Sequence, residues 1–296
     1  MMLITTNAKK IYNNVYQRIL PILIDKNESH STVELILSHY LNITSIDILM
    51  DESIALENQK SDMISLAINR LSNNEPIQYI LKEADFWGRK FIVNSDVLIP
   101  RCETEYMVQQ ILSENSHDNL KVLDICTGSG CIAITLQKEL SNPLVYALDI
   151  CNKALLVAKE NAIKHMAAIE IINYDILDPL LLQKLSLINL DILDIIVSNP
   201  PYVCMSEKSQ MQLKVLNHEP HKALFVPDTD PLIFYKAIVN VAASLLKPNG
   251  RMYLEINELY GIEIADLLIE HNFNKIDIHK DLNKKNRWIS CCNKTV

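Results

Sequence analysis

Glycine is scarce in this sequence, which has five glycines among 296 residues, against a usual share of about 7%. Each of the five is therefore expected at a position where no other residue fits. Apolar runs of about 18 residues, which a membrane-spanning helix needs, are also missing. The first residues, with Lys9 and Lys10, lack the apolar segment of a signal peptide. The sequence therefore predicts a cytoplasmic protein that does not contact a membrane.

An excess of basic residues is absent as well. Lysine and arginine together number 28 against 36 aspartate and glutamate residues, so the net charge is -8. This sign is unfavourable for a broad surface that binds nucleic acid phosphates, and we expect no direct nucleic acid binding. The seven cysteines are odd in number and form no C-x-x-C pair, so we expect reduced thiols with structural roles and no metal site.

Hydrophobic residues make up 49% of the chain and charged residues 22%, a composition that allows a sizeable core. Up to Asn74 the apolar residues recur at helical spacing, without the alternation of a strand. Aromatic and β-branched residues then surround Gly88 and predict a short hairpin. We therefore expect a helical domain at residues 1–80, a hairpin linker at 81–100 and a larger domain at 101–296.

Strands and helices alternate in the larger domain. The expected strands are residues 122–125, 145–149, 170–173, 192–198 and 252–256. Such alternation builds right-handed βαβ units and a parallel sheet with helices on both faces. Residues 275–279 and 288–292 read as two further strands joined by a polar turn, which we expect to pair antiparallel. The segment 180–194 is compatible with a helix, a loop or an early start of the next strand.

A loop with two glycines, Asp124-Ile125-Cys126-Thr127-Gly128-Ser129-Gly130, follows the expected strand at 122–125 and opens a helix. Glycines at the carboxyl end of a parallel strand let the backbone approach a ligand closely. We therefore expect cofactor contacts from Cys126, Thr127, Gly128, Ser129 and Gly130. With Ala133 the spacing satisfies G-x-G-x-x-A, so the loop alone does not separate a nicotinamide cofactor from S-adenosylmethionine.

Asp149 ends the second expected strand, about 20 residues beyond these glycines. A carboxylate at this spacing accepts hydrogen bonds from both ribose hydroxyls of a nucleotide-like ligand. Together with the loop, Asp149 favours an adenosine-type ligand over the alternative of a plain carboxylate at a helix N-terminus.

The most specific pattern is an apolar strand that runs directly into Asn199-Pro200-Pro201-Tyr202. The prolines fix φ and provide no N–H donors, and the first holds Asn199 extended, so the Asn199 side-chain oxygen and nearby carbonyls form a row of acceptors. Such a row suits a substrate NH2 group whose lone pair is directed at a methyl sulfonium, with the Tyr202 ring on its plane. We expect all four residues to bind the substrate, Asn199, Pro200 and Tyr202 to take part in catalysis, and Asn199 to border the cofactor. A plain rigid turn is the alternative.

These three segments resemble the S-adenosylmethionine-dependent methyltransferases that act on exocyclic or amide nitrogens. Further segments resemble signatures of the HemK/PrmC family in the same order: residues 75–80 (Glu-Pro-Ile-Gln-Tyr-Ile), 86–88 (Phe-Trp-Gly), 97–101 (Val-Leu-Ile-Pro-Arg), 103–105 (Glu-Thr-Glu), 219–220 (Glu-Pro) and 223–224 (Ala-Leu). The resemblance implies an α/β fold, a seven-stranded Rossmann-like methyltransferase sheet with a small N-terminal helical domain. It also implies methylation of the side-chain amide nitrogen of the glutamine in the Gly-Gly-Gln motif of class 1 peptide-chain release factors. We expect the enzyme to be a monomer.

The resemblance also implies further site residues. Asp175 and Ile176 would border the adenine of the cofactor. Arg101 and Glu103 would line the substrate cleft, the alternative being ordinary ion pairs at the start of a surface helix.

The chain departs from the family pattern at Cys126, Cys102 and His218, where Gly, Pro and an aromatic residue are usual. Cys126 also occurs in relatives that modify a ribosomal protein glutamine, so that substrate stays open beside the release factor. A nucleic acid adenine methyltransferase also uses Asn-Pro-Pro-Tyr for flipped bases, although the acidic net charge counts against it. A nicotinamide-dependent oxidoreductase uses the same glycine loop but leaves this motif without a role. The departures also leave open a catalytically inactive adapter.

Overall fold

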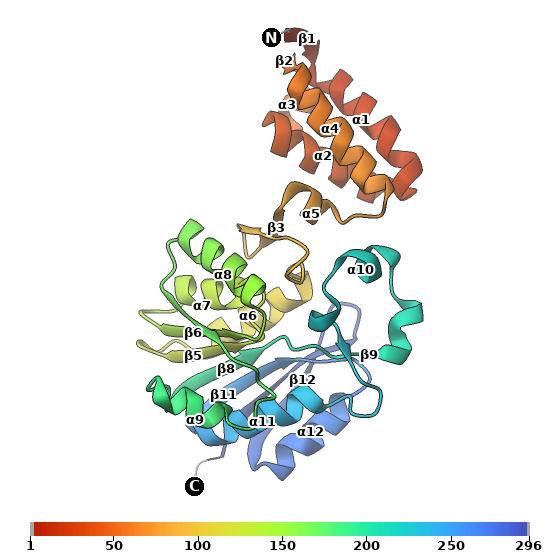
Figure 1. Ribbon diagram of the computed structural model, residues 1–296. Helices are drawn as coiled ribbons and strands as arrows, with labels where there is room; N and C mark the ends of the chain where they lie inside the picture. Colours follow the sequence, from red (N-terminus) through yellow and green to blue (C-terminus); the bar gives the residue numbers. More distant parts are fainter. Residues whose placement is uncertain (1–2, 295–296) are drawn as a thin grey trace. The chain divides into compact units, whose positions relative to one another are not determined.

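The computed structural model describes residues 3–294, which the contacts between residues divide into two units (Figure 1). The helical unit comprises the residues up to Glu83 together with Gln212–His218, and the sheet unit comprises Ala84–Met211 and the residues from Glu219 onward. The chain therefore passes between the units three times. No helix in residues 3–294 is long and apolar enough to cross a membrane.

The helical unit contains helices and one pair of strands. Its elements are β1 (Leu3–Asn7), α1 (Ala8–Leu23), α2 (Lys26–Leu41), α3 (Ser45–Met50), β2 (Ser53–Glu57), α4 (Asn58–Ser72), α5 (Ile77–Leu81) and α10 (Leu213–His218). The apolar residues at helical spacing pack into one core, with Ile19, Ile36 and Ala67 fully buried. The predicted helical domain is confirmed, and it also contains two strands that the sequence pattern did not reveal, because β1 and β2 pair antiparallel. No side chain of β2 is buried, so the apolar alternation that reveals a strand is absent there.

Arg70, near the end of α4, fixes the segment that leads into α5. Its Nε donates to Oε2 of Glu75 at 2.7 Å. Its Nη1 donates to the backbone carbonyl of Ile80 and its Nη2 to that of Tyr79, each at 3.3 Å. The hydrogen bond from Arg70 lowers the pKa of Glu75. Glu75 therefore has a structural role in the helical unit.

Helix α10 packs with the helical unit although it lies far along the chain. Nζ of Lys214 lies 3.1 Å from Oε1 of Glu28, and Nε2 of His218 lies 3.2 Å from the carbonyl oxygen of Asn73. The imidazole at position 218, where the family usually has an aromatic residue, thus makes a polar contact with the turn after α4.

The sheet unit is built around seven strands in the order β12-β13-β11-β8-β5-β6-β7. These strands are β5 (Lys121–Ile125), β6 (Leu144–Asp149), β7 (Ile169–Asn173), β8 (Leu193–Ser198), β11 (Leu246–Glu255), β12 (Phe273–Lys280) and β13 (Asn286–Asn293). Strand β13 runs antiparallel to β11 and β12, and the other neighbours are parallel. The predicted seven-stranded Rossmann-like sheet is confirmed, including its antiparallel end.

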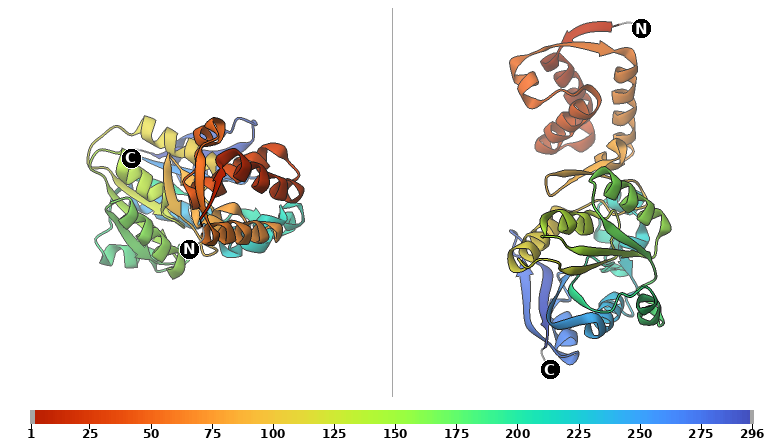
Figure 2. Two further views of the ribbon diagram at one scale, coloured as in Figure 1. Left: turned by 90° about the horizontal axis from the view of Figure 1, so that it is seen from above. Right: turned by 90° about the vertical axis from the view of Figure 1, so that its left-hand side faces the viewer.

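Helices cover both faces of this sheet (Figures 1 and 2). On one face lie α6 (Cys102–Glu114), α7 (Cys131–Glu139) and α8 (Asn152–Lys164), and on the other lie α9 (Leu181–Leu187), α11 (Ile233–Leu245) and α12 (Gly261–Glu270). The neighbours Ile196 and Val197 of β8 belong to the cores on opposite faces, as expected for a strand covered on both sides. The segment 180–194, for which the sequence allowed a helix, a loop or an early strand, forms helix α9 at Leu181–Leu187, and β8 begins at Leu193.

The hairpin of β3 (Glu83–Phe86) and β4 (Arg89–Ile92) belongs to the sheet unit from Ala84 onward. Trp87 and Gly88 join its strands with φ of 52° and 66°, as a two-residue type I′ turn requires. Phe86 and Phe91 are fully buried in the core beneath α6 and α7. The division by contacts places residues 84–100 with the sheet unit and 212–218 with the helical unit, whereas the sequence predicted domains at 1–80 and 101–296 joined by a hairpin linker at 81–100.

Between β8 and α11 the chain adds short elements. Strands β9 (Val203–Cys204) and β10 (Phe225–Val226) pair parallel, and 3-10 turns occur at Met205–Gln210 and His221–Ala223. Two-residue strands carry too little pattern to be predicted from sequence.

Candidate active site

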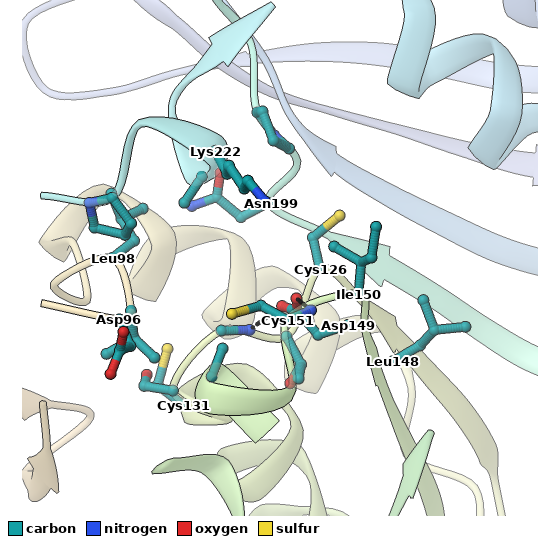
Figure 3. A pocket seen from close by; sticks show the side chains of 18 of the residues that line it. Asp96, Leu98, Cys126, Cys131, Leu148, Asp149, Ile150, Cys151, Asn199 and Lys222 are labelled. Carbon is teal, nitrogen blue, oxygen red and sulfur yellow. Dashed lines mark hydrogen bonds between the residues drawn. The ribbon is translucent and has the colours of Figure 1, made fainter. Parts of the chain in front are cut away.

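A cavity of about 340 Å3 lies in the sheet unit at the carboxyl ends of β5, β6 and β8 (Figure 3). Its lining comprises residues 95–98, 100, 101, 104, 126–129, 131, 132, 148–151, 154, 174–176, 199, 201, 220–223 and 234. The strand order reverses between β5 and β8, and open α/β sheets bind ligands at such a point. The volume lies within the range of about 300–1,000 Å3 that is usual for small-molecule sites.

The loop after β5 has three residues in the left-handed backbone region, with φ of 61° at Cys126, 55° at Gly128 and 80° at Gly130. A Cβ on Gly130 would lie 3.2 Å from side-chain atoms of Ile134 and Ala158, whereas a Cβ on Gly128 would meet no atom of the described chain within 4 Å. Gly130 therefore allows α7 to pack against α8. Gly128 instead leaves space at the cavity for a ligand.

Cys126 stands in this loop where the family usually has glycine. Its Cβ makes the positive φ unfavourable. Desolvation and the neighbouring carboxylates of Asp149 and Asp124 raise the pKa of the Cys126 thiol well above its usual value. The thiol is therefore neutral. It contributes a packing surface to the cavity and does not act as a nucleophile, because only the thiolate is nucleophilic.

Asp149 ends β6 and is oriented by backbone amides. Its Oδ2 accepts from the Gly128 N–H at 3.0 Å and its Oδ1 accepts from the Cys151 N–H at 2.9 Å. Burial raises the pKa of Asp149. Each carboxylate oxygen keeps a further acceptor site, so Asp149 lies beside the glycine loop with capacity for a hydroxyl donor.

Asp124 supports the loop from below and is fully buried. Its Oδ2 accepts from the Thr127 hydroxyl at 2.6 Å and from the Ala133 N–H at 3.2 Å, while Oδ1 has no partner within residues 3–294. Burial raises the pKa of Asp124 to about 7. The side chain thus joins the loop to the first turn of α7.

Asn161 of α8 was missed by the sequence analysis. Its Nδ2 lies 2.9 Å from the carbonyl oxygens of both Ser129 and Ile92, and its Oδ1 accepts from the Ile92 N–H at 2.6 Å. This fully buried amide ties the glycine loop to β4. The only signal in the sequence is a polar residue on the apolar face that Ala154 and Ala158 share.

The amide of Asn199 donates a hydrogen bond to a buried hydroxyl of α6. Its Nδ2 lies 3.4 Å from Oγ1 of Thr104, whose hydroxyl donates to Oε2 of Glu255 at 2.6 Å. Oδ1 of Asn199 accepts no hydrogen bond from the described residues. Figure 3 shows Asn199 at the same cavity as Cys126 and Asp149. A substrate NH2 group there has an acceptor available.

Tyr202 donates its hydroxyl to Oε1 of Glu255 at 3.1 Å, and burial raises its pKa well above the usual value. Among the described residues, the cavity lining includes Pro201 but not Pro200, Tyr202, Gly130 or Glu103. Stacking of the Tyr202 ring on a substrate amide therefore stays a prediction.

Asp175 and Ile176 follow β7 and both line the cavity. Oδ1 of Asp175 accepts from the Leu177 N–H at 2.9 Å. Ile176 is buried and lines the cavity together with Phe234, so an apolar surface is present where the adenine was expected.

Arg101 lines the cavity and pairs with the buried carboxylate of Glu219. Glu103 lies outside the lining and accepts from the Cys102 thiol at 3.2 Å. The two residues expected in the substrate cleft thus have different environments. Residues 3–294 contain no group of three or more His, Cys, Asp or Glu side chains placed to hold a metal ion.

Known proteins resemble both units. The model of the methyltransferase small domain matches residues 103–225, and that of the PrmC N-terminal domain matches residues 21–81. Several relatives carry the name release factor glutamine methyltransferase. The one from Flavobacterium psychrophilum is 40% identical over 95% of this chain and 97% of its own, and the one from Bacteroides thetaiotaomicron is 42% identical over 86% and 90%.

Solved structures share the fold. A methyltransferase from Pyrococcus furiosus aligns with a TM-score of 0.52 at 15% identity over 78% of this chain and 100% of its own. A T. thermophilus 16S rRNA methyltransferase in complex with AdoMet and guanosine aligns with a TM-score of 0.50 at 18% identity, over 72% of this chain and 50% of its own.

Proposed function

The chain belongs to the release factor glutamine methyltransferase family, and we propose that it transfers a methyl group from S-adenosyl-L-methionine to the side-chain amide nitrogen of a release factor glutamine. The target is the glutamine of the Gly-Gly-Gln motif in class 1 peptide-chain release factors. The observation that carries the proposal is the shared cavity of the glycine loop and the Asn199 amide, whose oxygen accepts from no donor among residues 3–294.

The residues at the cavity fit this cofactor. The open space over Gly128 admits its methionine part, the Asp149 carboxylate has capacity for the ribose hydroxyls, and Ile176 with Phe234 offers an apolar contact to the adenine. Cys126, Thr127, Ser129 and Asp175 complete the proposed cofactor site, and Gly130 contributes by packing its loop. When bound, S-adenosylmethionine supplies an electrophilic methyl group on sulfur.

The chain's own residues act by positioning the substrate amide. An amide nitrogen is a poor nucleophile because its lone pair is delocalised, so an acceptor such as Asn199 Oδ1 that holds one of its hydrogens orients it for attack. Tyr202, Pro200 and Pro201 complete the proposed substrate contacts, with Arg101 and Glu103 at the entrance. No strong base at the motif is needed when the nitrogen loses its proton to water after attack.

Methyl labelling tests the proposal directly. Purified enzyme is incubated with labelled S-adenosylmethionine and intact release factor, plasmid DNA or ribosomal protein in parallel. We expect label in the release factor, with mass spectrometry placing one methyl group on the glutamine of the Gly-Gly-Gln motif. Label in DNA or ribosomal protein alone would instead support one of the rival activities. Isothermal titration that shows no binding of the cofactor would support the inactive adapter.

We also propose that residues 1–80 recognise a folded partner, that the enzyme works as a cytoplasmic monomer, and that it does not bind nucleic acid directly. Because remote contacts contribute to transition-state binding, a short Gly-Gly-Gln peptide should have a much lower kcat/KM than the intact factor. Equal values for peptide and factor would contradict a docking role for the helical domain.

A further inference from the structure

The orientation of the Asn199 amide decides what this side chain offers to a substrate. A half-turn about the last side-chain bond exchanges its NH2 donor and its oxygen acceptor. Only the orientation with the oxygen toward the cavity accepts a hydrogen from a substrate NH2 group. A neighbouring group is therefore needed that favours this orientation over the reversed one.

The carboxylate of Glu255 gives the hydrogen bonds around Asn199 a fixed direction. The Thr104 hydroxyl donates to its Oε2 at 2.6 Å and the Tyr202 hydroxyl donates to its Oε1 at 3.1 Å. Burial raises the pKa of Glu255, but the hydroxyls of Thr104 and Tyr202 each donate to one of its oxygens and favour the ionised form. The ionised carboxylate only accepts, so the single hydroxyl hydrogen of Thr104 is used at Glu255. Oγ1 of Thr104 then faces Asn199 as an acceptor, which selects the NH2 side of the Asn199 amide at 3.4 Å.

Burial makes this arrangement specific. Glu255 and Thr104 are 4% and 2% exposed, so water does not compete freely for their hydrogen bonds. The end of β11 is itself fixed, because the Tyr235 hydroxyl donates to the backbone carbonyl of Glu255 at 3.0 Å. The carboxylate therefore has a defined position between α6 and the segment after β8.

We propose that Glu255 and Thr104 are positioning residues that hold the Asn199 amide with its oxygen toward the substrate. The proposal rests on the proposed methyl transfer and deepens it, because it assigns two residues that act on the substrate through Asn199, with Thr104 itself also lining the cavity. The same carboxylate holds Tyr202 by its hydroxyl, so one buried side chain orients both polar groups of the Asn-Pro-Pro-Tyr segment.

The test uses Thr104→Val, Thr104→Ser and Glu255→Gln in the full-length protein. Valine removes the hydroxyl at similar size, serine keeps it, and glutamine introduces a donor that reverses the hydrogen-bond direction. We expect kcat with intact release factor to fall about 10-fold to 100-fold for the valine and glutamine variants, with KM and the Kd for S-adenosylmethionine within about twofold of wild type. Thr104→Ser should retain most of the wild-type kcat.

Thr135→Val is the matched control. Thr135 is fully buried in α7, and its hydroxyl has no partner in residues 3–294, so this change removes a buried hydroxyl away from Asn199 and should leave kcat unchanged. Glu255→Gln preserves the side-chain shape and serves as the second variant if Thr104→Val does not fold. The kcat values are compared only for variants that bind S-adenosylmethionine with a Kd close to that of wild type, which shows that the cavity is intact.

A double-mutant cycle separates positioning from general damage. If Thr104 acts through Asn199, Thr104→Val should lower kcat by less than about twofold in an Asn199→Ala background. Equal losses in both backgrounds, or wild-type kcat for both Thr104→Val and Glu255→Gln, would overturn the proposal. Those results still leave methylation by the wild-type enzyme in place, whereas no labelling by wild type would overturn the proposed function itself.

Discussion

Arg101 and Glu219 form an ion pair across 118 positions of the chain, with Nη2 of Arg101 lying 2.7 Å from Oε1 and 2.8 Å from Oε2 of Glu219. The Glu219 side chain is 1% exposed and that of Arg101 is 32% exposed. The N–H of Ile99 also points at Oε2 of Glu219 at 3.4 Å. The pair thereby joins the segment before α6 to the segment at residues 220–223, and both segments line the cavity.

Arg101→Ala should lower the free energy of unfolding by about 2–3 kcal/mol, below the ~3–5 kcal/mol typical of a fully buried pair, because Arg101 is partly exposed. The loss arises from the unpaired carboxylate of Glu219. Urea denaturation of Arg101→Ala and of the double variant with Glu219→Gln provides the measurement. The double variant should recover part of the loss, and equal stability of the single and double variants would contradict this account.

Asp149→Ala should weaken the binding of S-adenosylmethionine by about 1.5–3 kcal/mol, because charged hydrogen bonds to the ribose hydroxyls are lost. Isothermal titration measures the Kd. Asp85→Ala is the control, since it removes a carboxylate whose side chain is 61% exposed and pairs with Lys90 on the hairpin. An unchanged Kd in Asp149→Ala would remove Asp149 from the cofactor site.

Asn199→Ala should lower the rate of methyl transfer about 100-fold to 1,000-fold, by analogy with the removal of a positioned donor in an oxyanion site. The Kd for S-adenosylmethionine should change little, because the glycine loop and Asp149 stay in place. Asn199→Asp should be at least as harmful, since it adds a charge at a partly buried position. A variant that melts earlier and still methylates release factor at the wild-type rate would identify the segment as a plain rigid turn.

Gly128→Ala and Gly130→Ala should separate ligand space from packing. Both replacements meet the cost of a positive φ, about 1–2 kcal/mol, but only Gly130→Ala adds overlap with Ile134 and Ala158, for about 1–3 kcal/mol more. Gly128→Ala should therefore lose less stability than Gly130→Ala. It should nevertheless lose more affinity for S-adenosylmethionine, because its added methyl group occupies space at the cavity. Thermal melts with titration of the cofactor check this order, and the reverse order of stability would disprove it.

Asp124 should make stability fall with rising pH. Its pKa is about 7 in the folded protein and about 4 in an unfolded chain, so the folded state binds more protons between these values. Stability from protonated Asp124 is fully present below about pH 4 and is lost as pH rises through about 7. Asp124→Asn keeps an acceptor for Thr127 and Ala133 and does not titrate. Urea denaturation at pH 5 and pH 7.5 should show wild type losing stability relative to this variant, and a constant difference would exclude the effect.

The sequence predicted the sheet and the edge at which the site lies. The central strands β5, β6 and β8 were visible as apolar runs, and Gly128, Asp149 and Asn199 each follow or end such a run. Because carboxyl ends of parallel strands meet at one edge, these residues were expected together, and the structure places all three at one cavity.

Other parts of the site were not predictable because they depend on contacts between distant positions. Thr104 and Glu255 are 151 positions apart, and neither shows in the sequence that it faces Asn199. Asn161 reaches Ile92 across 69 positions. Side-chain hydrogen bonds of this kind leave no periodic pattern, and they are defined only once the elements are packed.

The discontinuous composition of the helical unit sets an order on its assembly during synthesis. The residues up to Glu83 leave the ribosome first, but α10, which ends at His218, completes the same unit. The 135 residues between positions 83 and 218 take roughly 7–27 s at about 5–20 residues per second. Throughout this interval Glu28 and Asn73 lack their contacts with Lys214 and His218. The helical unit is therefore synthesised early in part, but it is completed only after most of the sheet unit has been made.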